Sequence, residues 1–134
     1  MSSLAPALTR VRVRYADTDQ MGVVYYANYL IWFEVGRTEL LRTRGWSYRE
    51  MEASGVALPV IEAACTYHRG SRYDDELEIR TVGGLMSPVR LRFDYEIVRC
   101  GDDAKIVSGR TLHASVNTRG RPCKLPDRLK DLFA

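Results

Sequence analysis

Two carboxylates, Asp17 and Asp19, stand two positions apart in the stretch YADTDQMGVVYYANY, which covers residues 15–29. A carboxylate at the edge of an apolar pocket can act as a general base on water or as a nucleophile. The start of a helix supplies free backbone N–H groups, which can hold a developing oxyanion. These two parts together are sufficient for acyl-transfer hydrolysis. Spacing alone leaves open a structural role, in which both acids satisfy donors of a turn or a helix cap; that role is the commoner one for such residues.

Other catalytic patterns find no support in the sequence. It has no GxSxG motif, and its two histidines, His68 and His113, fall in predicted strands, so a Ser-His-Asp triad is poorly supported. HExxH, EF-hand and P-loop patterns are missing as well. The pair Gly83-Gly84 indicates a turn at the end of a strand. The three cysteines lack CxxC spacing. We therefore expect neither a metal ion nor a bound cofactor.

The composition is that of a globular protein with one domain, residues 1–134. Hydrophobic residues make up 46% of the chain and the formal net charge is +3, with acids interspersed among the bases. That mixture argues against a nucleic-acid partner. No stretch approaches the roughly 20 apolar residues of a membrane span, and the first residues lack the apolar core of a signal peptide. With an odd number of cysteines, these features predict a cytoplasmic protein.

One long helix and about five strands must position the acidic stretch. Alternation predicts a strand over 10–15, with Val11, Val13 and Tyr15 facing inward. A helix is predicted over 26–45, followed by a short helix that has a capping box at Ser47. The remaining strands are expected within 56–70, 75–84, 89–99 and 104–117, before a last short helix over 126–134. The first half of the long helix is apolar almost all round, which predicts that a curled, mostly antiparallel sheet wraps it in an α+β fold.

Several stretches of this sequence resemble the 4-hydroxybenzoyl-CoA thioesterase family of hotdog-fold enzymes. The central motif runs from Asp19 through Gly22-Val23-Val24-Tyr25 to Asn28-Tyr29. The segments YADTD, GVVY, RTELLR and YDDELEI are especially similar to the branch of acyl-CoA thioesterases associated with the Tol–Pal system. The resemblance implies a hotdog fold, in which a curved antiparallel sheet wraps one central helix. It also implies hydrolysis of an acyl-CoA thioester to a free acid and CoA, by homodimers or homotetramers whose active sites lie between subunits.

The resemblance also assigns roles to individual residues. The catalytic carboxylate falls on Asp19, and the oxyanion donor, a backbone N–H at the helix start, falls on Tyr26. Substrate contacts are implied for Gly22, Val24, Asn28 and Arg90. Asn28 is also expected to shape the helix start. Two departures stand out: the branch usually carries His at position 26, and only Arg90 stands where some relatives have a basic cluster for the CoA phosphates. Candidates for those phosphate contacts are Arg69, Arg72, Arg90 and Arg92.

Three alternatives stay open at this stage. Glu34, in the apolar part of the predicted helix, is a rival for the catalytic carboxylate, although a structural pair with Arg37 is the simpler interpretation. A non-catalytic hotdog module that binds acyl thioesters or a protein partner would share the fold. A hotdog dehydratase is less well supported, because no histidine falls in the acidic loop or the helix.

Overall fold

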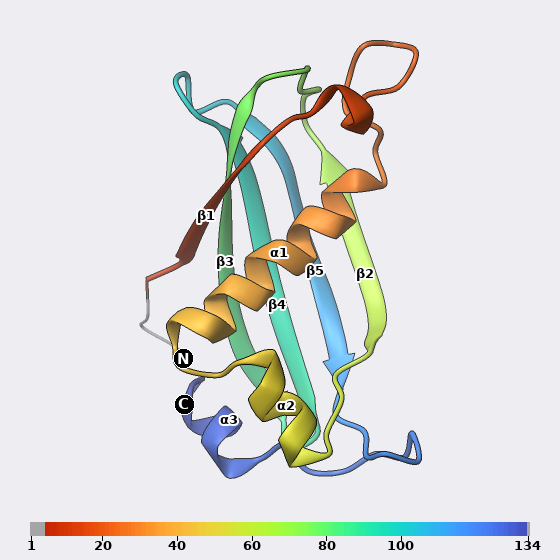
Figure 1. Cartoon of the computed structure of the whole chain (residues 1–134), viewed down its shortest axis with the longest axis vertical. Helices are drawn as coiled ribbons and strands as arrows, with labels where there is room; N and C mark the ends of the chain where they lie inside the picture. Colours follow the sequence, from red (N-terminus) through yellow and green to blue (C-terminus); the bar gives the residue numbers. More distant parts are fainter. Residues whose placement is uncertain (1–4, 134) are drawn as a thin grey trace.

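Helix α1 crosses one face of a five-stranded antiparallel sheet in the computed structural model, which describes residues 5–133 (Figure 1). The strands lie in the order β1-β3-β4-β5-β2. Their bounds are β1 Ala7–Arg12, β2 Val60–Tyr67, β3 Glu76–Ser87, β4 Arg90–Arg99 and β5 Lys105–Ala114. The helices are α1 Asn28–Thr43, α2 Tyr48–Ser54 and α3 Asp127–Asp131, with a 3-10 turn, η1, over Tyr15–Asp17. The α+β hotdog architecture expected from the sequence is confirmed.

Alternation along β3 and β4 decides which residues face the helix. Leu77, Ile79 and Thr81 of β3 are buried, as are Leu91, Phe93, Tyr95 and Ile97 of β4. The antiparallel register pairs Thr81 with Tyr95 and Ile79 with Ile97, so inward-facing residues meet side by side. The sequence predicts the same inward face, because Leu77, Ile79 and Thr81, and then Val89, Leu91, Phe93, Tyr95 and Ile97, stand at alternate positions among charged residues.

Two glycines allow α1 to approach the sheet closely. The backbone of Gly36 in α1 lies against the side chains of Thr81 and Ile79, with no room for a Cβ atom. The Phe33 ring lies over Gly109 of β5, where an added Cβ would be 2.6 Å from that ring. Phe33 also stacks on Tyr95 with ring centroids 4.2 Å apart. Helix and sheet are therefore fixed at two points along α1.

The helix ends follow their sequence signals. Gly45 has φ +88° just after α1, and Gly55 has φ +71° after α2, conformations that glycine adopts without strain. Ser47 caps α2, because its hydroxyl accepts the Glu50 N–H at 3.1 Å. The Glu50 side chain pairs with Arg128 at 2.9 Å instead of completing the predicted capping box. Pro59 directly precedes β2 at the edge of the sheet.

Three local expectations are wrong. The first strand ends at Arg12, and Tyr15 is exposed in the turn that follows, because the chain leaves the sheet there to form η1. Gly83 and Gly84 lie inside β3, where Gly83 makes room for the rings of Phe133 and Phe93. Nor is the first half of α1 covered all round within the chain, since the side chain of Ile31 is 56% exposed.

A chain of hydrogen bonds crosses the core beside α1. Arg37 Nη1 donates to the Tyr95 hydroxyl at 3.4 Å, Tyr95 lies 2.6 Å from the Thr111 hydroxyl, and Thr111 lies 2.8 Å from His113 Nε2. His113 Nδ1 donates to the Leu58 carbonyl oxygen at 2.8 Å. Burial lowers the pKa of His113 despite the bond to Leu58, and Arg37 lowers it further. His113 is thus a structural residue of the core.

Replacing Gly109 by alanine should destabilise the protein, because the new methyl group would press on the Phe33 ring and on the Ala64 backbone. Overpacking of this kind costs about 1–3 kcal/mol. Urea unfolding at one fixed protein concentration measures the effect. Gly84→Ala is the matched control, because a Cβ at Gly84 of β3 meets no atom within 4 Å. Equal unfolding midpoints for the two variants would contradict the close helix–sheet contact.

Candidate active site

Asp17 is the structural member of the acidic pair. Its side chain is buried, with 6% of the residue exposed, and its two oxygens accept the Arg14 backbone N–H at 2.8 Å and the Arg14 guanidinium at 2.9 Å. Burial alone would raise the pKa of Asp17, but the hydrogen bonds and charge of Arg14 outweigh it and lower that pKa. The carboxylate is therefore engaged in holding the end of the first strand.

Asp19 lies in a tight loop, half-buried. Its Oδ1 accepts the Met21 N–H at 2.9 Å, and its carbonyl oxygen accepts the Gly22 N–H at 3.0 Å. The backbone N–H of Asp19 donates to the Val23 carbonyl at 2.9 Å, and Gly22 closes the loop with φ +79°, in the region that favours glycine. Within residues 5–133 no ion pair engages Asp19. Its second carboxylate oxygen has no hydrogen-bond or ion-pair partner within that range.

The same loop is tied directly to the start of α1. The Asp17 carbonyl oxygen accepts two hydrogen bonds, from the Tyr25 N–H at 2.9 Å and from Asn28 Nδ2 at 2.8 Å. Asn28 is the first residue of α1, so its side chain shapes the helix start as expected. The Tyr26 backbone N–H has no acceptor among the described residues. The Asp17 carbonyl therefore connects the loop that carries Asp19 to the helix start that carries the Tyr26 N–H, which is unpaired among those residues.

A third segment, residues 70–72, packs against the acidic loop. The Ser71 carbonyl accepts the Val24 N–H at 2.8 Å, and the Ser71 hydroxyl lies 2.6 Å from the Tyr29 hydroxyl. Val24 is buried, with 4% exposed, so its side chain packs in the core. The Arg72 guanidinium lies beside Gly22. Nothing in the sequence pointed to Ser71, because its partner Tyr29 is 42 positions away.

Arg90 does not join this group within one chain. It begins β4, whereas the acidic loop follows β1 at the Glu76 end of the sheet, near Arg99 at the far end of β4. Arg90 and Arg99 are nine positions apart along the strand, about 30 Å. Of the four arginines considered for the CoA phosphates, Arg72 has its guanidinium beside Gly22 of the loop, and Arg69 directly precedes Gly70, which lies against Val23 of the same loop.

Glu34 does not occupy the environment expected of it. It is exposed on α1, so its charge carries no burial cost, and no ion pair joins it to Arg37 in the described part of the chain. Arg37 instead donates to Tyr95. Among residues 5–133 no group of three or more His, Cys, Asp or Glu side chains could hold a metal ion. In that range no helix is both long and apolar enough to cross a membrane.

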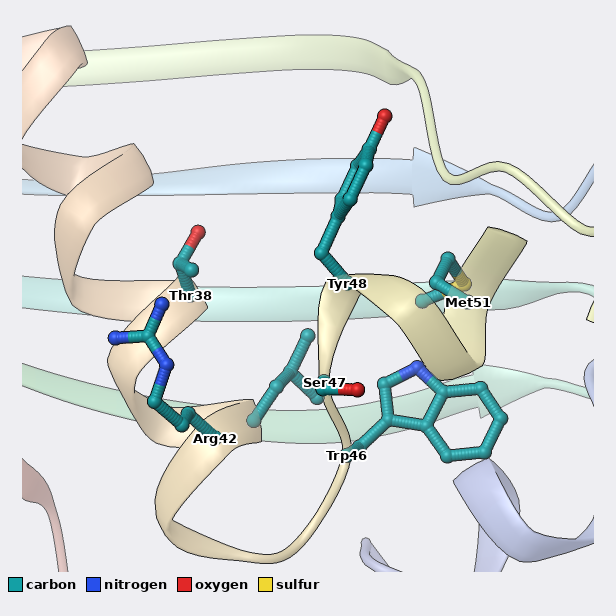
Figure 2. A pocket seen from close by; sticks show the side chains of 7 residues that line it. Thr38, Arg42, Trp46, Ser47, Tyr48 and Met51 are labelled. Carbon is teal, nitrogen blue, oxygen red and sulfur yellow. The ribbon is translucent and has the colours of Figure 1, made fainter. Parts of the chain in front are cut away.

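A pocket lies at the other end of α1, where the chain turns into α2 (Figure 2). It is lined by Thr38, Leu41, Arg42, Trp46, Ser47, Tyr48 and Met51. Its volume of about 80 Å³ is below the roughly 300–1,000 Å³ typical of small-molecule sites. Thr38 is ten residues along α1 from Asn28, about 15 Å. This pocket is therefore separate from the acidic loop.

Comparison with known proteins gives consistent matches. The sequence profile of the thioesterase-like superfamily matches residues 13–133. The acyl-CoA thioesterase YbgC of Haemophilus influenzae is 32% identical over 126 residues, which cover 92% of this chain and 90% of that protein. YneP of Bacillus subtilis is 46% identical over 71 residues, 53% of this chain and only 51% of that protein. A crystal structure from Thermus thermophilus superposes with a TM-score of 0.88 at 33% identity, covering 95% of this chain and 96% of that one.

The two acids should respond differently to loss of charge. Asp17→Asn removes an acceptor for Arg14 and should lower the free energy of unfolding by about 1–2 kcal/mol. Asp19→Asn keeps an acceptor for the Met21 N–H and should change the free energy of unfolding by less than about 0.5 kcal/mol. Because the pKa of Asp17 is lowered on folding, its stabilisation is complete above about pH 4 and is lost as the pH falls further. Urea unfolding at pH 7 tests the ranking, and equal losses in the two variants would contradict it.

Proposed function

Because the chain belongs to the thioesterase-like superfamily, we propose that it hydrolyses acyl-CoA thioesters to a free carboxylic acid and coenzyme A. Asp19 is the catalytic carboxylate, and the Tyr26 backbone N–H is the oxyanion donor. The observation that carries this proposal is the link between the two. A carboxylate with a free oxygen and an amide without an acceptor among residues 5–133 are joined through the Asp17 carbonyl, which binds both Tyr25 and Asn28.

The reaction begins when the thioester carbonyl oxygen accepts the Tyr26 N–H, which polarises the carbonyl carbon. In one route Asp19 takes a proton from water as the water oxygen attacks that carbon. In the other route Asp19 attacks it directly, and water then cleaves the resulting anhydride. Either way the C–S bond breaks, CoA leaves as a thiolate and the carboxylic acid is released. In the first route the proton held by Asp19 passes to the thiolate or to solvent, and in the second the thiolate takes a proton from solvent, so that Asp19 ends as a carboxylate in both. The amide at the helix start stabilises the negative charge on the oxygen in each step.

The remaining residues of the site have supporting roles in this proposal. Gly22 allows the turn that carries Asp19, and Asn28 fixes the helix start. Val24 is buried and its backbone ties the loop to Ser71, while a contact between its side chain and substrate stays a prediction. Arg72, beside Gly22, is the cation that we assign to a CoA phosphate. Arg90 can reach the acidic loop only from another copy of the chain.

Thiol release from a panel of short, long and aromatic acyl-CoAs tests the activity and identifies the acyl class. We expect hydrolysis of at least one class, and a fall in kcat/KM of at least about 10²-fold in Asp19→Asn, since that is the usual cost of losing a general base. Asp94→Asn, an exposed acid on the sheet, serves as the control for loss of one charge. Full activity of Asp19→Asn would refute its catalytic role. A folded protein that binds CoA esters but cleaves none would instead be a binding module.

We infer further that the working unit contains at least two copies of the chain. Apolar side chains lie exposed along the first half of α1 and on the edge strand β2, namely Leu30, Ile31, Val60, Ile61 and Tyr67. The outer edge of β2 pairs with no other strand among residues 5–133. An edge strand beside an apolar surface favours association through both. A second copy would cover this surface and bring its own residues toward the acidic loop.

The mass in solution tests this inference. We expect the wild type to have at least twice the chain mass of 15.3 kDa by light scattering after size exclusion. Ile31→Glu should shift it toward the monomer, because a charge would be buried in the contact. Leu8→Glu is the matched control, since Leu8 is 60% exposed on β1, at the opposite edge of the sheet. A monomeric wild type would rule out the shared site.

A further inference from the structure

Tyr67 connects the edge of the sheet to the start of α1. It is the last residue of β2, and its hydroxyl donates to the Tyr26 carbonyl oxygen at 3.3 Å. Its ring meets that of Tyr26 edge-on, with centroids 6.2 Å apart, and is tilted against that of Tyr29 at 5.8 Å. The side chain is nevertheless 47% exposed, so burial of the ring alone does not account for its position.

The peptide groups on either side of Tyr26 are held in different ways. The one before it, which carries the Tyr26 N–H, is bonded among the described residues only through its carbonyl, which accepts the Asn28 N–H at 2.9 Å. The one after it has a weaker local bond, from the Tyr29 N–H to the Tyr26 carbonyl at 3.4 Å. At that length the bond lies beyond the usual range for N–H···O contacts. The Tyr67 hydroxyl bond, at 3.3 Å, is also longer than usual for an O–H···O contact. The Tyr26 carbonyl is therefore held by two long bonds, one from within the helix and one from outside it.

We propose that Tyr67 is a positioning residue, whose hydroxyl holds the Tyr26 carbonyl and thereby orients the backbone that presents the Tyr26 N–H to the substrate. This inference rests on the proposed function. Its physical basis is that an oxyanion donor is effective only when it is already aligned with the charge that develops. Without the Tyr67 bond, the Tyr26 carbonyl would be held only from within the helix, and the first turn would be freer to rotate. The Tyr26 N–H would then point away from the oxyanion for part of the time.

The hydroxyl is suited to a donor role and to no proton transfer. Burial, together with Cys65, Tyr26 and Tyr29, raises the pKa of Tyr67 to about 12. It stays protonated at neutral pH and keeps donating to the carbonyl. The hydroxyl donates to a backbone oxygen and not to Asp19. Tyr67 therefore acts through Tyr26.

Tyr67→Phe tests the role, because phenylalanine keeps the ring contacts and removes only the hydroxyl. We expect kcat to fall about tenfold, less than the roughly 10²–10³-fold cost of losing an oxyanion donor outright, while KM stays within twofold. Tyr73→Phe is the matched control: Tyr73 is an exposed tyrosine whose ring packs on Tyr15 and whose hydroxyl has no partner among residues 5–133. Rates are expressed per folded subunit from far-UV circular dichroism, so that a loss of stability is not counted as a loss of rate.

Wild type, Asp19→Asn, Tyr67→Phe and Tyr73→Phe are assayed side by side on the best acyl-CoA of the panel. An active wild type, with a drop in kcat only in Asp19→Asn and Tyr67→Phe, supports the role. Unchanged kcat in Tyr67→Phe overturns it and leaves the proposed function intact. A rise in KM as large as the fall in kcat also overturns it, since the hydroxyl would then contact substrate directly. If the wild type hydrolyses none of the acyl-CoAs, both the proposed function and the positioning role of Tyr67 are overturned.

Discussion

The contact between α1 and the sheet determines where everything else in this fold lies. It depends on two positions that have no side chain, Gly36 in the helix and Gly109 in β5, with the Phe33 ring filling the space between helix and strand. Because both points are on the same helix, they fix its direction as well as its distance. The N-terminal end of α1 consequently emerges beside the acidic loop, and its C-terminal end turns into α2 at the far end of the sheet (Figure 1). The candidate site is thus a result of helix packing as much as of the loop sequence.

Within the loop, two similar carboxylates have different tasks because their surroundings differ. Asp17 is buried and its oxygens are occupied by Arg14, while its carbonyl joins the loop to the helix. That rigid arrangement leaves Asp19 half-buried, with one oxygen free, in a turn that Gly22 allows. Of the two acids, Asp17 therefore has a structural role and Asp19 is the candidate catalytic carboxylate.

Much of the fold and of the candidate site could be predicted from the sequence, and the predictions that were wrong have physical reasons. The alternation over 89–97 correctly predicted the inward residues of β4, since local periodicity sets which face a strand residue occupies. Gly83-Gly84 was misjudged because a glycine pair usually marks a turn, whereas here Phe133, fifty positions away, requires the space. Glu34 and Ile31 were expected to be covered, but one chain leaves them exposed. The link of Tyr67 to Tyr26 has no local signal, because it joins residues 41 positions apart. Distant contacts are what sequence pattern cannot supply.

The buried hydrogen-bond chain from Arg37 to Leu58 has a direction. The Leu58 carbonyl can only accept, so Nδ1 of His113 carries the proton and Nε2 must accept from Thr111; Arg37 at the other end can only donate. Each hydroxyl between them therefore has a single orientation that satisfies its neighbours. Such a chain constrains how the sequence can drift over evolution. Replacing one of these side chains alone leaves the neighbouring group without a hydrogen-bond partner. We therefore expect Arg37, Tyr95, Thr111 and His113 to change together or to stay as they are.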